Sequence, residues 1–194
     1  MPCFIGDQHV EKHWSVPVHN RMLFAAFGVC MLLLYGFHLA RFRLGGVLLD
    51  EVGDLATILA LLGQFSPHQL WVHIGVTVGL DLLFPLAYAT LFGGLIARGF
   101  GAYSPALLVP LAVLVGFDLF ENLSQLALLL LTLLQAAPAT IEIIAAFKAL
   151  VTPIKFSMLY LTSAISVMAV MSLGIQQSLR LWDFGRARKL QKRH

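Results

Sequence analysis

Long apolar runs alternate along the chain with short segments that contain glycine, proline or charged residues. Four runs are long enough for a helix that crosses the hydrocarbon core of a bilayer, which needs about 20 residues. We place them at approximately 21–43, 66–98, 104–135 and 141–182. The pattern predicts an all-α integral membrane protein built as a four-transmembrane-helix bundle.

The segments between the runs carry helix start and stop signals. Ser66-Pro67 and Ser104-Pro105 each combine an N-cap residue with a proline at the first helical position. Gly45 and Gly46 end the first run.

The last run would be roughly 60 Å long as a helix, about twice the hydrocarbon thickness. We therefore expect it to bend at Pro153 and to protrude from the membrane.

A shorter pattern lies between the first and second runs. Apolar residues recur in it at helical spacing, at Leu48, Val52, Leu55, Leu59 and Leu62. Three acidic residues lie near its start: Asp50, Glu51 and Asp54. This pattern predicts a short amphipathic helix at the membrane interface with a solvated acidic first turn. A metal held by Asp50 and Asp54 is the weaker interpretation.

Composition and charge support a membrane location. Hydrophobic residues make up 59% of the chain and charged residues 12%, which excludes an ordinary soluble domain. We divide the chain into an N-terminal tail (1–20), a transmembrane domain (21–182) and a basic tail (183–194). The distribution of lysine and arginine places both termini in the cytoplasm, most simply of a bacterial cytoplasmic (inner) membrane. The basic tail directly follows a spanning helix, so we expect it to face lipid headgroups rather than nucleic acid.

Polar residues form a stripe on each of the last three runs. The third run carries Asp118, Glu121, Asn122 and Gln125 at offsets of three, four and seven, which is one face of a helix. The stripe of the second run consists of His73, Thr77, Asp81 and Tyr88. Pro85 lies within it and should free the carbonyl of Asp81 from its usual helical partner. The stripe of the fourth run consists of Lys148, Thr152, Lys155, Thr162 and Ser166.

Charges inside a membrane are costly, so these stripes should meet. Comparable depths predict that Lys155 forms an ion pair with Asp118 or Glu121, and that Asp81 joins them. A second acid would then be protonated, because like charges do not share a dry site. Asn122 and Gln125 would complete the hydrogen bonds.

Intramembrane acid/base chemistry on a small lipophilic molecule, such as a sterol, terpenoid or quinone, is the function that we expect from this cluster. The predicted catalytic residues are Asp81, Asp118, Glu121 and Lys155, and the predicted substrate-binding residues are Tyr88, Asn122 and Gln125. Three alternatives remain: a structural network that fixes helix packing, an accessory subunit that binds another membrane protein, and a small oligomeric proton-coupled transporter. We expect membrane lipids or a lipophile as partners, with no cofactor and no metal.

In placing carboxylates within a membrane bundle, the stripes loosely resemble the four-span sterol isomerase-like bundles. Their spacings match no motif of that family, so no family is assigned and no residue role is transferred.

Overall fold

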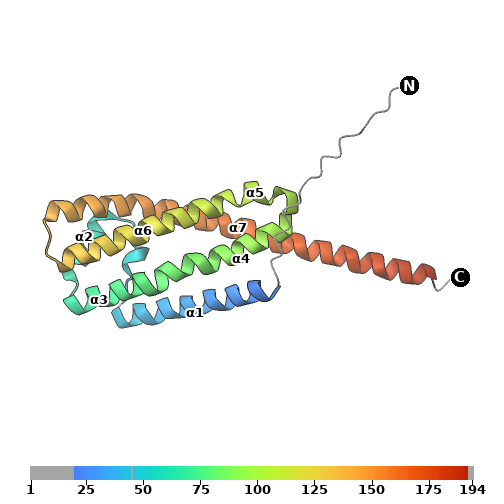
Figure 1. Ribbon diagram of the computed structural model, residues 1–194, viewed down its shortest axis with the longest axis horizontal. Helices are drawn as coiled ribbons and strands as arrows, with labels where there is room; N and C mark the ends of the chain where they lie inside the picture. The colour runs from blue at the N-terminus through green and yellow to red at the C-terminus, as the bar shows by residue number, and fades with distance from the viewer. Residues whose placement is uncertain (1–19, 45, 192–194) are drawn as a thin grey trace, which may run out of the picture.

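The computed structural model describes residues 20–44 and 46–191 of the 194-residue chain. Its elements are all helical and run in the order α1 (Asn20–Leu44), η1 (Leu49–Glu51), α2 (Leu55–Gln64), α3 (Pro67–Val76), η2 (Thr77–Asp81), α4 (Leu82–Phe100), η3 (Gly101–Tyr103), α5 (Ser104–Leu107), α6 (Val109–Leu133) and α7 (Pro138–Gln191). Figure 1 shows the long helices side by side as a bundle. The predicted N-terminal tail lies outside the described residues, apart from Asn20.

Four stretches of the described chain are long and apolar enough to cross a membrane: residues 20–44, 67–107, 109–133 and 138–179. The all-helical class and the four candidate spans predicted from the sequence are therefore confirmed. Each stretch overlaps a predicted run; most ends differ by five residues or fewer, and the second stretch continues nine residues beyond its predicted end, to residue 107.

The bundle is held together along α7. Helix α6 packs against α7 over much of its length, and α4 lies against both α7 and α1. Two apolar clusters form the core. One surrounds Leu62, Leu128 and Ala145, and the other surrounds Leu33 and Leu114. Between these two clusters lie the buried polar residues Asp118 to Gln125 of α6 and Lys148 to Lys155 of α7, so apolar packing lies on either side of this polar layer.

The segment between the first two candidate spans differs from its prediction. The short helix α2 begins at Leu55, where the Asp54 side chain caps it by accepting a hydrogen bond of 2.8 Å from the Thr57 backbone N–H. Hydrogen bonds from Thr57 lower the pKa of Asp54. Asp50 and Glu51 belong instead to the separate turn η1. The predicted helix start near Leu48 is therefore wrong, because the stronger N-cap lies six residues later.

The second candidate span is one long helix with an interruption. A capping box between Ser66 and Gln69 starts α3, as the Ser-Pro signal predicted. The backbone then forms a π-helical turn, η2, before continuing as α4. Such turns occur often at functional sites, and η2 lies beside the polar layer.

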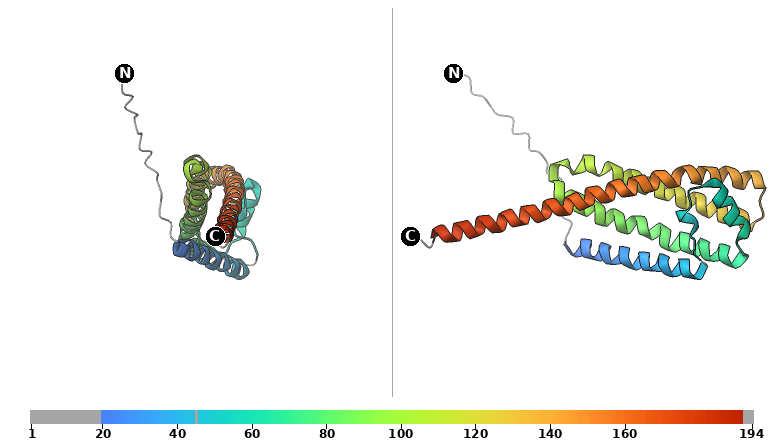
Figure 2. Two further views of the ribbon diagram at one scale, coloured as in Figure 1. Left: turned by 90° about the vertical axis from the view of Figure 1, so that its right-hand side faces the viewer. Right: turned by 180° about the vertical axis from the view of Figure 1, so that it is seen from behind.

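Helix α7 is longer than predicted. It begins at Pro138, continues through Pro153 without a break and ends at Gln191, so the described part of the predicted basic tail is helical. Figure 2 shows a gradual change of direction along α7 rather than a sharp kink. Its last turns extend well beyond the other helices.

Candidate functional site

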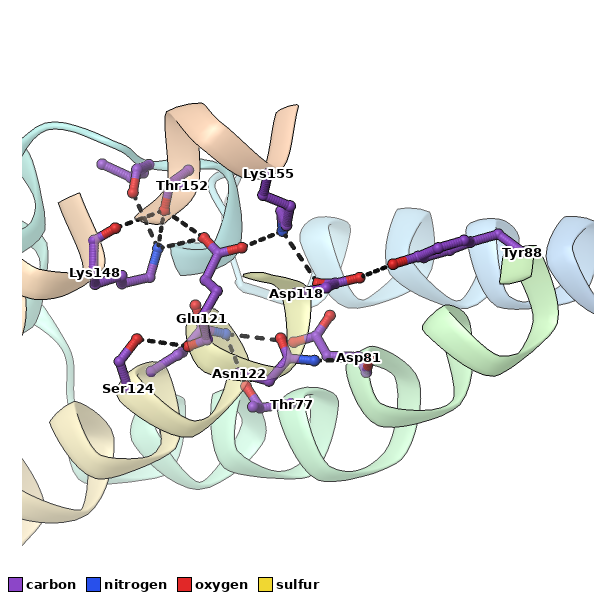
Figure 3. A network of polar contacts seen from close by, with 12 residues as sticks. Thr77, Asp81, Tyr88, Asp118, Glu121, Asn122, Ser124, Lys148, Thr152 and Lys155 are labelled. Carbon is purple, nitrogen blue, oxygen red and sulfur yellow. Dashed lines mark hydrogen bonds and ion pairs between the residues drawn. The ribbon is translucent and has the colours of Figure 1, made fainter. Parts of the chain in front are cut away.

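The turn η2 and the helices α4, α6 and α7 bring most of the predicted polar residues together inside the bundle (Figure 3). Glu121 and Lys148 are fully buried, and Asp81, Asp118 and Lys155 are each less than 10% exposed. Buried charges need partners, because an isolated charge in an apolar interior is strongly destabilising. The partners fall into two groups on either side of Lys155.

The first group, which we call the inner network, consists of Glu121, Lys148 and Thr152. Lys148 Nζ lies 3.1 Å from Glu121 Oε1, and the Thr152 hydroxyl donates a hydrogen bond of 2.5 Å to the same oxygen. Lys148 Nζ also donates to the backbone carbonyl of Val52 at 3.1 Å, which ties the segment after η1 to α7. The three side chains of the inner network are therefore buried and paired with one another.

Lys155 connects the inner network to Asp118. Its ammonium group forms an ion pair with Glu121 Oε2 and lies 3.6 Å from Asp118 Oδ1. The other oxygen of Asp118 accepts a hydrogen bond of 2.8 Å from the Tyr88 hydroxyl. The predicted ion pairing of Lys155 with the α6 carboxylates is confirmed, and it involves both of them.

Two amides of α6 hold the π-helical turn η2. Asn122 Nδ2 donates a hydrogen bond of 2.9 Å to the backbone carbonyl of Asp81. This is the carbonyl that Pro85 leaves without an N–H donor, as predicted, since proline has none. Gln125 Nε2 donates to the Thr77 hydroxyl at 2.8 Å and approaches Asp81 Oδ2 at 3.4 Å. The amides therefore fix the backbone and the side chain of Asp81.

A cavity of about 290 Å³ lies next to this layer, between α1, η1, α4, α6 and α7. Its apolar wall is aliphatic and aromatic, formed by Leu34, Phe37, Leu48, Phe84, Phe92, Leu114, Phe156 and Leu159. Its polar wall consists of Asp50, Glu51, Asp81, Tyr88, Asp118 and Lys155. Concave, mostly apolar sites with a few convergent polar groups are typical of sites for small molecules.

The cavity divides the predicted site residues into two sets. Asp81, Tyr88, Asp118 and Lys155 line it. Glu121, Asn122 and Gln125 do not line it but contact residues that do. A molecule in the cavity would meet the first set directly and the second set only through their neighbours.

Sequence reasoning missed Lys148 and Asp50 as parts of this site. Lys148 lies seven residues before Lys155 on the same helical face, so the spacing could have indicated it. Asp50 gave no such signal. The prediction that it belongs to a solvated first turn is wrong, since η1 folds back over the bundle and Asp50 lines the cavity. Burial raises the pKa of the Asp50 carboxyl, and the nearby charge of Lys155 opposes this rise.

Glu51 is exposed, as predicted, but it belongs to η1 and also lines the cavity, and its carboxylate forms an ion pair with Arg41 at the end of α1. That pair is more than one third exposed. It joins η1 to α1 across the edge of the cavity.

No protein-family model, curated protein or solved structure matches this chain. The chemistry of the site therefore has to be inferred from its own residues.

Proposed function

We propose that this integral membrane protein binds a small lipophilic molecule in the cavity and exchanges a proton with it. The observation that carries this proposal is the position of Asp118. Its carboxylate lines a cavity whose other wall is aromatic and aliphatic, and it is held by the Tyr88 hydroxyl and the Lys155 ammonium group. An apolar wall suits a molecule that dissolves in lipid, and a positioned carboxyl suits proton transfer.

The residues of the site take different parts in this proposal. Asp118 gives or takes the proton, while Tyr88 and Lys155 set its orientation and proton affinity. Asp81 is a second acid on the same cavity wall as Asp118. Glu121 holds both lysines in place, and Asn122 and Gln125 position Asp81, so these three are positioning residues.

The proposed ligand reaches the cavity from the membrane, between α1 and α7. Both helices line the cavity, through Leu34 and Phe37 on one side and Phe156 and Leu159 on the other. Helix α1 packs mainly on α4 rather than on α7. The outward faces of both helices carry exposed apolar side chains such as Phe42 and Tyr160, which suit contact with lipid.

In the proposed topology both termini lie in the cytoplasm, in a bacterial cytoplasmic membrane, with η1 and the interfacial helix α2 on the outer side. Arg21, Arg98 and the basic residues after Leu179 then lie on the cytoplasmic side, as the positive-inside rule requires. An introduced cysteine at Ala137 should accordingly react with a membrane-impermeant reagent from the outer side only.

Identification of bound molecules by mass spectrometry after purification of the full chain tests the function. We expect a lipophile to accompany the unchanged protein and to be lost from Leu159→Trp, which fills the cavity. Leu161→Trp is the matched control, because Leu161 lies on the same helix with 45% of its surface exposed. The Asp118→Asn variant should retain the lipophile in a form that differs by a proton or by the position of a double bond.

The inner network favours a second function. Because Glu121 is paired with two lysines and Thr152, the network can stabilise helix packing without any ligand. In that case the chain would serve as an accessory subunit. Purification would then recover a second membrane protein and no lipophile, and Leu159→Trp would leave this partner bound.

A further inference from the structure

The charges around the cavity do not balance. Glu121 and Asp118 are matched by Lys148 and Lys155, and Glu51 is matched by Arg41. This leaves two further acids on the cavity wall, Asp50 and Asp81. No lysine or arginine among the described side chains forms an ion pair with either of them. Two carboxylates in a largely apolar cavity are unfavourable unless they take up protons or a cation.

The aromatic wall of the cavity is continuous. The Phe37 and Phe84 ring centroids are 5.8 Å apart, those of Phe84 and Tyr88 are 5.3 Å apart, and those of Tyr88 and Phe92 are 6.0 Å apart. All four rings line the cavity. Aromatic faces attract cations, most strongly where water is excluded.

The cavity already holds one cation in this way. Lys155 Nζ lies 5.2 Å from the centroid of the Phe156 ring, and both residues line the cavity. The ammonium group of Lys155 is committed to Glu121 and Asp118 on its other side. Its charge acts on Asp50 from nearby, but it forms no ion pair with Asp50 or Asp81, so these two acids are available to a second cation.

We propose that the ligand of this cavity is a lipophilic organic cation, an amphiphile with an alkylammonium group. This inference rests on the proposed function and specifies its ligand class. The cationic group lies between Asp50 and Asp81, and the apolar part lies along the row of aromatic rings. Asp81 is well placed for this role because it is 6% exposed and held by Gln125. Asp50, in η1, brings the second negative charge to the cavity wall.

The test uses the full chain in nanodiscs of zwitterionic phosphatidylcholine. The probes are hexyltrimethylammonium and its neutral isostere, in which a carbon replaces the nitrogen. Apparent Kd values come from the dependence of the thermal unfolding midpoint on probe concentration. We expect the cation to bind about tenfold or more tightly than the isostere, which corresponds to about 1.4 kcal/mol.

The variants separate charge from shape. Asp50→Asn combined with Asp81→Asn should weaken binding of the cation about tenfold or more and leave binding of the isostere within about twofold. Asp54→Asn is the matched control. It removes a charge from the same segment at an exposed residue outside the cavity, and asparagine also caps helices well. It should change neither affinity. If the double variant does not fold, Asp50→Asn alone gives the same comparison without altering a long helix.

The outcomes distinguish this inference from the proposed function. Equal binding of both probes, or equal loss of both in the double variant, would overturn the cationic ligand class while leaving a lipophile-binding cavity. Stabilisation by neither probe, together with the absence of a co-purifying lipophile, would overturn both.

Discussion

The inner network and the wall of the cavity lie side by side in the same layer of the bundle, yet their carboxylates differ in how completely they are ion-paired. In the inner network, Glu121 and Lys148 are fully buried, and Lys148, Thr152 and Lys155 together engage both carboxylate oxygens of Glu121. On the cavity wall, Asp118 shares Lys155 with Glu121, and Asp81 and Asp50 have no ion-pair partner among the described residues. The first region is closed, and the second is open to a ligand.

This difference separates two uses of buried charge. A closed pair contributes little net stability relative to an apolar core, but removing one partner is strongly destabilising. A carboxylate that lines the cavity can instead be protonated, or its charge can be compensated by a bound ligand. Substitutions on the two sides of Lys155 should therefore have unequal effects on the free energy of unfolding.

The largest effect is expected for Lys148→Met. This change removes the only described cation bound to Glu121 Oε1 and also the hydrogen bond to Val52. It should lower the free energy of unfolding by about 3 to 5 kcal/mol, measured by reversible unfolding in mixed micelles. Adding Glu121→Gln should recover much of this loss, which a double-mutant cycle reports as coupling. The control Glu142→Gln, on an exposed part of α7, should stay within about 0.5 kcal/mol.

A smaller loss is expected for Lys155→Met, about 1 to 3 kcal/mol in the same measurement. Glu121 keeps Lys148, and Asp118 keeps the hydrogen bond from Tyr88 while it lines a cavity where it can take up a proton. Asp118→Asn should recover part of the loss. A loss as large as that of Lys148→Met would show that Asp118, like Glu121 in the inner network, cannot take up a proton when its lysine is removed.

The smallest effect, with the opposite sign, is expected for Asp50→Asn. Burial raises the pKa of Asp50 above its ordinary value of 3.8. As the pH rises through 3.8, the unfolded chain loses this proton before the folded chain does, so the carboxyl disfavours folding. The variant should therefore unfold at a higher temperature than the unchanged protein at neutral pH. This advantage should shrink as the pH falls toward 3.8, and a constant advantage across the range would contradict an open, titrating carboxyl at this position.

Sequence reasoning was strongest where periodicity and capping agreed. The long apolar runs predicted the four candidate spans, and the polar stripes predicted the meeting of Asp118 and Glu121 with Lys155. The effect of Pro85 on the Asp81 carbonyl followed from covalent chemistry alone. The end of α7 was placed too early, because the basic residues near the C-terminus favour solvent but do not prevent a helix from continuing.

The sequence by itself determined which residues need polar partners, because burial of an unpaired charge among apolar helices is so unfavourable that lysines and carboxylates on neighbouring helices have to meet. Only the tertiary structure decided which of them close into the inner network and which line the cavity. That division depends on η1, whose return over the bundle brings Asp50 to the cavity and the Val52 carbonyl to Lys148. The path of such a loop cannot be predicted from periodicity, since it is fixed by contacts with residues about 100 positions away in the chain.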